Sequence, residues 1–381
     1  MGGLISNQNT IVYQKPHYEL LDGLRGVAAL LVIWYHFFEG FATSGVDQKF
    51  NHGFLAVDFF FVLSGFVIGY AYDGRWKLGL TPGRFILRRI IRLQPMVIIA
   101  VVLGVIAYII QGCEHWDHTK AAPWAIIVSF IFGLFLIPAI PGTQIDIRGN
   151  GEMFPLVGPS WSLFFEYIGS VLYAIWLHRL TKTALIWFVI ISGVGLAIVA
   201  LGNISEVYSL GVGWSMAGWG FLGGFLRLTF SFGIGLLMSR NFKPIKIKGA
   251  FWICSAAIVS MMIMPYITLT GYPSILNAFY ELICTLFIFP AVVYLGASGK
   301  TTDEKSRRIC SFLGEISYPI YIIHYPIMYL FYAWVWNNNY SFSNVWYVTV
   351  IIFVVLIPVA YLIEKFYDLP IRKWLMIKLQ K

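Results

Sequence analysis

The stretch Leu21–Phe38, LDGLRGVAALLVIWYHFF, decides the fold of this chain. It is an apolar segment close to the roughly 20 residues that cross a bilayer as a helix, and its basic side chains are Arg25 and His36. His36 follows Arg25 by eleven positions, so a rise of about 1.5 Å per residue separates them by roughly 16 Å. We therefore expect Arg25 near one membrane surface and His36 near the middle of the hydrocarbon, where an ionisable side chain marks a functional site. A capping arginine and a histidine bonded to a neighbouring helix would explain this one segment about equally well.

The composition of the whole chain indicates an integral membrane protein. Of 381 residues, 59% are hydrophobic and 12% are charged, whereas a soluble domain carries about 25% charge. Lys and Arg beside apolar segments account for the net charge of +9, so nucleic acid is not expected as a partner. The four cysteines lack metal or redox spacing, so we expect neither a disulfide framework nor a metal. The polar leader runs into a segment of full spanning length, so no cleavable signal peptide is expected.

Ten apolar segments of spanning length follow one another along the chain. They lie at about 22–41, 54–72, 93–111, 160–178, 184–202, 214–238, 250–269, 276–298, 312–335 and 345–364. Another apolar segment, 124–140, is shorter and is followed closely by Pro141. Lys and Arg gather after every second spanning segment, and the loops near 203–213, 270–275 and 336–344 contain none.

This alternation of charge predicts the topology. By the positive-inside rule both termini are cytoplasmic. The basic stretches 75–92 and 179–183 are then on one side, which makes 124–140 a re-entrant or interfacial segment. The predicted fold is an all-α integral membrane protein, a bundle of about ten transmembrane helices. We expect a leader at 1–20, a membrane domain at 21–366 and a basic cytoplasmic tail at 367–381.

Three ionisable side chains from different segments reach one depth in this topology. His36, Glu166 and His324 each lie eleven or twelve residues from the cytoplasmic end of a segment, roughly 16–18 Å deep. A histidine beside a carboxylate suggests a general base and the group that fixes its tautomer. A buried pair that serves only helix packing, or the proton relay of a transporter, would use the same residues.

Arg88, Arg89 and Arg92 lie at the expected cytoplasmic start of the third segment, in RRIIRLQP. On a helix Arg88 and Arg92 share a face and Arg89 lies about 100° round, an arrangement suited to a multiply charged anion. An ordinary positive-inside cluster would have the same arginine density.

Asp58 and Ser64 interrupt the very apolar second segment. Asp58 lies near the outer surface, where a cap or interface role is nearly as well supported as a catalytic one. Ser64 has no adjacent base and so no nucleophile signature, although Ser64-Gly65 would let another helix approach closely. Arg227 lies in mid-segment and needs a buried carboxylate partner, for which Glu281 is one candidate.

Seven blocks spread over nearly the whole chain carry a resemblance to a known family. They are LDGLRGVAALLVIWYHF (Leu21–Phe37), GFLAVDFFFVLSGFVIG (Gly53–Gly69), RRIIRLQP (Arg88–Pro95), PSWSLFFEYIGSVLY (Pro159–Tyr173), RLTFSFGIGLLMSR (Arg227–Arg240), ISYPIYIIHYPI (Ile316–Ile327) and YLIEKFYDLPIRK (Tyr361–Lys373). In these blocks the sequence resembles the acyltransferase-3 family of bacterial membrane O-acyltransferases, which acylate O-antigen, exopolysaccharide and peptidoglycan among other acceptors.

The resemblance implies an acyl-CoA donor, acetyl-CoA foremost, taken from the cytoplasm, and a glycan hydroxyl as acceptor. It implies His36 and Glu166 as the catalytic pair. It also implies a donor site formed by Arg25, Arg88, Arg89 and Arg92, and we assign to the substrate cavity the side chains of Asp58, Ser64, Tyr318 and His324. The expected location is the bacterial inner membrane.

Two further expectations complete the interpretation. The segment after Glu364 is about one helix long, so we expect no SGNH-type hydrolase domain and direct delivery of the acyl group. Acceptor recognition is expected in 112–123, 124–140 and 141–159. The competing interpretation is a transporter or flippase that uses His36 and Glu166 as a proton relay, and it predicts no dependence on acyl-CoA.

Overall fold

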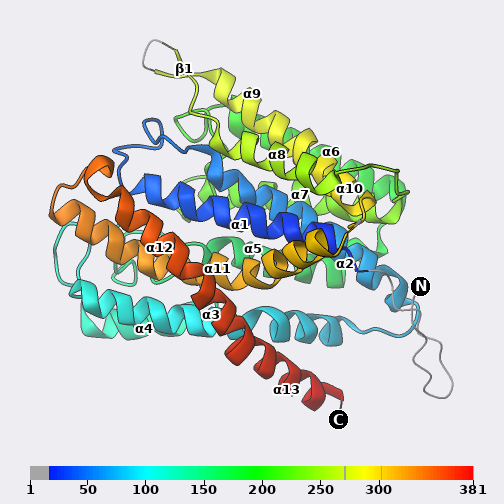
Figure 1. Ribbon diagram of the computed structural model, residues 1–381, viewed down its shortest axis with the longest axis horizontal. Coiled ribbons are helices and arrows are strands. Elements are labelled where there is room, and N and C mark those ends of the chain that lie inside the picture. Colours follow the sequence, from blue (N-terminus) through cyan, green and yellow to red (C-terminus); the bar gives the residue numbers. More distant parts are fainter. Residues whose placement is uncertain (1–16, 270–271, 302, 381) are drawn as a thin grey trace.

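Helices make up nearly all of the regular structure in the computed structural model, which describes residues 17–269, 272–301 and 303–380 (Figure 1). The α-helices are α1 (Glu19–Glu39), α2 (Ala56–Trp76), α3 (Pro82–Gln111), α4 (Pro123–Leu134), α5 (Ser160–Ile175), α6 (Lys182–Leu201), α7 (Gly220–Arg240), α8 (Ala250–Ile263), α9 (Ile275–Ile283), α10 (Phe289–Ser298), α11 (Glu304–Asn337), α12 (Phe342–Ile363) and α13 (Leu369–Gln380). Short 3-10 turns form η1 (His52–Leu55) and η2 (Leu177–Arg179), and π-helical turns form η3 (Cys284–Ile288) and η4 (Glu364–Asp368). Two short strands, β1 (Thr268–Leu269) and β2 (Tyr272–Pro273), pair antiparallel.

The all-α prediction is confirmed, and every predicted apolar segment contains a helix. Among the described residues seven helical segments are long and apolar enough to cross a membrane: α1, η1 with α2, α3, α6, α7, the run α9–α10 and the run α12–α13. The count of ten crossings and the cytoplasmic side of the termini stay predictions. The predicted leader lies mostly outside the described residues.

Several helices are shorter than the apolar segments that contain them. α4 has 12 residues, about 18 Å, which is below the roughly 20 residues of a full crossing. α8 has 14 residues and ends before Pro265, because the residue before a proline is driven out of the helical conformation. Met264 accordingly has a ψ of 128°. α5 has 16 residues, ends at Ile175 and carries Glu166 near its middle.

Glycines let two pairs of helices cross at backbone contact. α2 packs against α7 at Gly65 and Gly235, where an added Cβ would overlap the carbonyl oxygens of Phe232 and Val62. This confirms the close approach predicted at Ser64-Gly65. α1 packs along α11, and a Cβ on Gly26 would overlap the Leu313 carbonyl. These crossings hold α1, α2, α7 and α11 around the interior cavities described below.

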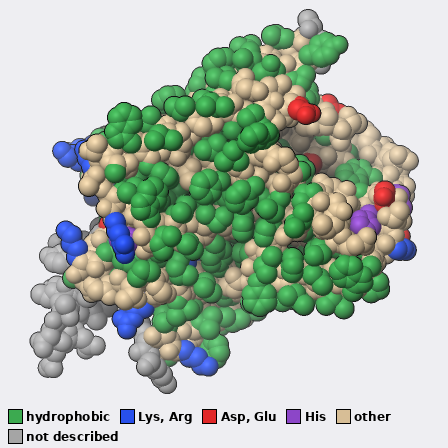
Figure 2. All heavy atoms as spheres, turned by 180° about the vertical axis from the view of Figure 1, so that it is seen from behind, with side chains coloured by type: hydrophobic (Ala, Val, Ile, Leu, Met, Phe, Trp, Pro, Cys, Tyr) green, Lys and Arg blue, Asp and Glu red, His purple; other side chains and the backbone are tan. Residues whose placement is uncertain are grey.

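The surface separates apolar and charged side chains. Figure 2 shows hydrophobic side chains over most of one broad face, with Lys and Arg at one end of the molecule and acidic and His side chains toward the other. Exposed apolar side chains occur in mid-helix, such as Ile106 in α3, Ile191 in α6 and Val354 in α12. Apolar exposure on this scale fits a surface that faces lipid.

Candidate functional site

Three adjoining cavities run through the interior of the bundle. The arginine cavity, of about 160 Å³, is lined by Arg25, Arg89, Arg92 and Glu166 among others. The histidine cavity, of about 210 Å³, contains His36. The wide vestibule, of about 1090 Å³, is lined mainly by the segments 39–54, 141–151 and 204–220.

Shared lining residues show the order of the cavities. Val57 and Tyr321 line both the arginine and the histidine cavity. Glu39 and Trp214 are among the residues that line both the histidine cavity and the vestibule. The histidine cavity therefore lies between the other two, and the Tyr321 hydroxyl, bonded at 2.8 Å to Ser162 Oγ, stands at its boundary with the arginine cavity.

Glu166 is held within the arginine cavity. Its Oε1 pairs with the Arg89 guanidinium and accepts a hydrogen bond of 3.1 Å from Ser64 Oγ. Arg89 also donates from Nε to Ser170 Oγ at 3.2 Å. α3 and α5 are thus joined by a charge-assisted contact, to which α2 contributes Ser64.

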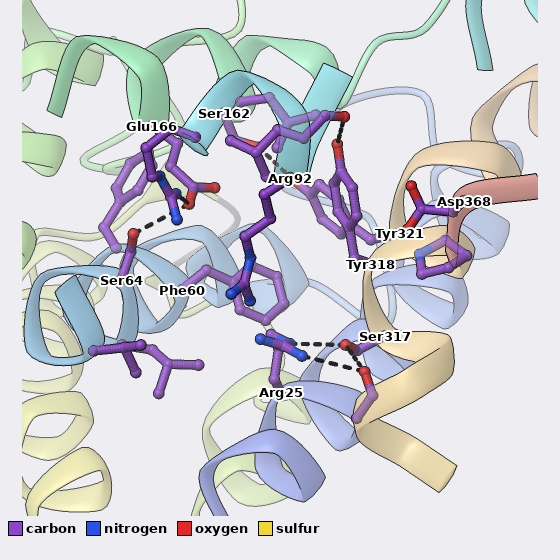
Figure 3. A pocket seen from close by; sticks show the side chains of 18 of the residues that line it. Arg25, Phe60, Ser64, Arg92, Ser162, Glu166, Ser317, Tyr318, Tyr321 and Asp368 are labelled. Atoms are coloured by element: carbon purple, nitrogen blue, oxygen red, sulfur yellow. Dashed lines mark hydrogen bonds and ion pairs between the residues drawn. The ribbon is translucent and has the colours of Figure 1, made fainter. Parts of the chain in front are cut away.

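Arg25 and Arg92 point toward one another in this cavity (Figure 3). Arg25 donates to Ser317 Oγ at 2.8 Å and pairs with Asp22 at 3.1 Å. Arg92 is exposed to the cavity, and the described residues show no ion pair for it. Arg88, on the same helix, does not line the cavity, so the structure brings together three of the four predicted donor-site arginines.

The arginine cavity is less basic than the predicted cluster. Four arginines line it, but so do four carboxylates, those of Glu166, Glu315, Glu364 and Asp368. Arg372 pairs with Glu364 at 2.7 Å and with Asp368 at 2.8 Å, at the π-helical turn between α12 and α13. Arg92 is the cavity arginine for which the described residues show no ion pair. It is therefore the side chain most available to attract an anion into this cavity.

His36 lies in the last turn of α1 and is bound by a carboxylate that the interpretation of the sequence missed. Its Nδ1 lies 2.7 Å from Glu39 Oε2. The Tyr332 hydroxyl shares its one proton between the His36 carbonyl, at 2.7 Å, and Glu39 Oε2, at 3.0 Å. Because an ionised carboxylate only accepts, a neutral His36 ring bound in this way carries its proton on Nδ1 and has its lone pair on Nε2. This is the arrangement of a histidine general base and its orienting carboxylate.

The described contacts differ from the expected pairing of His36 with Glu166. Glu166 binds Arg89 and Ser64 and lines the arginine cavity, whereas His36 binds Glu39 and lines the histidine cavity. Counting residues from a membrane surface gives only a height along the helix axis, not the direction in which the side chain points.

His324 lies beside His36, as the depth argument predicts for these two. Their ring centroids are 5.3 Å apart. His324 is fully buried, donates from Nδ1 to the Ile320 carbonyl at 3.0 Å, and lines none of the three cavities. Its Nε2 has no hydrogen-bond partner among the described residues. Tyr325 packs edge-on against His36 at 4.7 Å and does line the histidine cavity.

Asp58 lies away from the cavities, while Tyr318 and Ser64 line one. Asp58 is buried and pairs with Arg227, whose Nε donates to it at 3.1 Å. Arg227 lines the histidine cavity, so Asp58 fixes a cavity residue. Glu281, the suggested partner of Arg227, is bound elsewhere, to Ser209, Leu210 and Asn277. Tyr318 lines the arginine cavity and donates to the Leu93 carbonyl at 2.6 Å.

A second acid of the histidine cavity, Glu152, was also missed. It is buried, accepts from the Tyr329 hydroxyl, and binds Asn150 Nδ2 at 3.0 Å. Burial raises the pKa of Glu152 to about 7. Glu39 could have been found from the sequence, because it follows His36 by three positions and residues three apart share a face of a helix. Glu152 follows a glycine-rich loop, and nothing local predicts that this loop folds onto His36.

The described residues contain no group of three or more His, Cys, Asp or Glu side chains that would hold a metal ion.

Comparisons with known proteins find relatives that are named as O-acetyltransferases. Protein 2 in the picA locus of Rhizobium radiobacter is 35% identical over 188 residues, covering 48% of this chain and 93% of that protein. A protein of Staphylococcus aureus strain COL that is named as an O-acetyltransferase is 25% identical, with 95% of this chain and 58% of that protein covered. The peptidoglycan O-acetyltransferase OatA of Listeria monocytogenes is 26% identical, with 84% of this chain and 51% of that protein covered.

The chain thus spans little more than half the length of these last two relatives. No solved structure matches it. The family model described as "Acyltransferase domain" matches residues 18–365, which is nearly the whole chain. The chain therefore belongs to the acyltransferase-3 family of integral-membrane O-acyltransferases.

Proposed function

We propose that this protein transfers an acyl group, acetyl foremost, from acyl-CoA to a hydroxyl of a cell-surface glycan, with His36 as general base. One observation carries the proposal. His36 is bound through Nδ1 to Glu39 at 2.7 Å, in a cavity that adjoins an arginine-lined cavity on one side and a wide vestibule on the other. A base between two entrances is what a transfer between two substrates requires.

The arginine cavity is our candidate for the donor site. Arg92 lacks an ion pair among the described residues, so its cation is available to a phosphate group, and it points toward Arg25, which pairs with Asp22. Tyr321 lines both this cavity and the histidine cavity, so an acyl-pantetheine arm bound here would extend past Tyr321 toward His36. We assign to Glu166 the role of fixing Arg89 and Ser64 in this wall.

In the proposed reaction His36 Nε2 accepts the proton of the acceptor hydroxyl while its oxygen attacks the thioester carbon. The carbon–sulfur bond breaks, and the sulfur takes the proton back from Nε2, so His36 returns to its starting state. Glu39 keeps the Nδ1 proton in place and stabilises the imidazolium that forms in between.

We further propose that the arginine end faces the cytoplasm of a bacterium and that the vestibule faces outward. The gathering of Lys and Arg at one end of the molecule supports this orientation (Figure 2). The relatives named above are bacterial proteins, which supports the bacterial membrane.

Binding and turnover of acetyl-CoA by the purified protein in detergent test the proposal. We expect His36→Ala to bind acetyl-CoA as the wild type does but to abolish transfer. Arg92→Ala is expected to weaken binding by about tenfold, the worth of one charge-assisted contact of about 1.4 kcal/mol. Arg88→Ala is the matched control, because Arg88 does not line the cavity. Absence of affinity for any acyl-CoA would overturn the proposal and favour the transporter.

A further inference from the structure

The described residues that line the wide vestibule carry charge of mainly one sign. Three acids line it, Glu39, Asp146 and Glu206, and no Lys or Arg does, although His115 is present. The arginine cavity, by contrast, has four cations against four carboxylates. The two ends of the same path through the bundle therefore differ in charge, with balanced charges in the arginine cavity and an excess of acids in the vestibule.

No cation neutralises two of these acids in the described structure. Asp146 is buried and accepts backbone N–H groups from Gly149 at 3.1 Å and Gly151 at 2.9 Å, which fixes its carboxylate but leaves its charge. The Glu206 side chain is exposed, and the described residues show no hydrogen bond or ion pair for it. Apart from His115, the ionisable Asp, Glu, Lys, Arg and His side chains of the lining are therefore all acids.

The rest of the lining suits a carbohydrate. Trp214, Trp219 and Trp336 line the vestibule and are 44%, 59% and 43% exposed. Asn51, Gln144 and Asn150 add amide groups to the same wall. Sugars present apolar C–H faces, which indole rings cover, and hydroxyl edges, which amides and carboxylates bind.

We propose that the vestibule selects its acceptor by charge. It admits a neutral or amino-bearing carbohydrate and disfavours one with a carboxylate or phosphate near the hydroxyl to be acylated. Glu206 is the residue through which this preference is set, because its carboxylate is free and lies outside the His36 machinery. The proposal rests on the acyl transfer proposed above for the identity of the occupant.

The charge of the vestibule is measured without any acyl transfer. Ala217 lines the vestibule and is exposed, so Ala217→Cys places a thiol there, in a chain with Cys113→Ser. Its reaction rates with methanethiosulfonate reagents bearing a trimethylammonium or a sulfonate group are compared with those of Asn338→Cys, an exposed position outside the vestibule lining. We expect the ratio of the cationic to the anionic reaction rate to be about fivefold or more higher at position 217 than at position 338, because the acids attract the cationic reagent and repel the anionic one.

Variants of Glu206 test whether this residue causes the difference in reaction rates at position 217. Glu206→Gln is expected to lower the ratio at position 217 and Glu206→Lys to lower it further, while Glu114→Lys, outside the vestibule lining, leaves it unchanged. Equal ratios at 217 and 338, or a ratio that ignores Glu206, would overturn the proposal.

Acceptor preference is then compared with acetyl-CoA as donor. The three acceptors are N-acetylglucosamine oligomers, which are neutral, glucosamine oligomers, which are cationic, and N-acetylmuramic acid, which carries a carboxylate. We expect the lowest kcat/KM for N-acetylmuramic acid. In Glu206→Lys we expect the difference in kcat/KM between this acidic sugar and the other two acceptors to be smaller. Equally fast transfer to the acidic sugar refutes charge selection while acyl transfer itself stands. Failure to bind acetyl-CoA would refute the proposed function and leave the thiol measurement valid.

Discussion

At the scale of single residues, two carboxylates compete for the role of partner to His36. Glu39 lies 2.7 Å from His36 Nδ1, whereas Glu166 is bound to Arg89. We therefore expect Glu39→Gln to lower kcat by about 100-fold, within the range of general-base catalysis, with little change in acetyl-CoA affinity. Glu166→Gln should instead weaken acetyl-CoA binding by disordering Arg89. Steady-state kinetics and donor binding of both variants separate the roles, and the opposite pattern would return the orienting role to Glu166.

Glu152 gives the folding stability a dependence on pH. Burial raises its pKa from 4.5 to about 7. Below about pH 4.5 both the folded and unfolded states hold the proton, and above about 7 neither does. Between these values only the folded state holds it, so stability falls as pH rises, by up to about 1.4 kcal/mol per unit.

Glu152→Gln removes this titration and keeps a polar group for Tyr329. Melting temperatures in detergent at pH 5.5, 6.5 and 7.5 should fall more steeply for the wild type than for the variant. Parallel curves would mean that Glu152 does not hold its proton in the folded state.

At the scale of elements, the crossing of α2 and α7 depends on the absence of side chains. A Cβ at Gly65 would overlap the Phe232 carbonyl oxygen, so Gly65→Val should destabilise the fold by about 1–3 kcal/mol or more. Gly74 lies in the same helix with nothing near its Cβ position, so Gly74→Ala should be neutral or stabilise by up to about 1 kcal/mol. Thermal unfolding of the two variants compares them directly. A Gly65→Val protein as stable as the wild type would show that α2 and α7 can move apart without lowering the free energy of unfolding.

The helices were largely predictable and the site was only partly so, for physical reasons. Hydropathy over a window reports burial in lipid or core, which is why α1 through α12 coincide with the apolar segments. It does not report where a helix stops, as at Pro265. Residue counts give depth, so His36 and His324 were predicted at one level, but the partner of His36 depends on side-chain direction. Glu152 reaches the site through a loop whose packing is entirely non-local.

At the scale of the whole molecule, the proposed function and the order of the three cavities together predict that donor and acceptor enter from opposite ends. In sealed proteoliposomes of uniform orientation, acetyl-CoA on the arginine side and acceptor on the vestibule side should sustain transfer. Acetyl-CoA on the vestibule side should give none. The experiment requires a membrane-impermeant acceptor and an assay for leakage. Equal rates from both sides would contradict a path with two distinct entrances.

The buried pair of Asp58 and Arg227 has a consequence for the synthesis of the protein on the ribosome. The two residues are 169 positions apart, so at about 5–20 residues per second the ribosome makes Arg227 roughly 10–30 s after Asp58. During that interval the Asp58 carboxylate lacks the cation with which it pairs in the folded protein. The nascent chain therefore cannot form this ion pair until α7 has been made. A ribosome that stalls before α7 leaves a fragment in which Asp58 has no Arg227 to pair with.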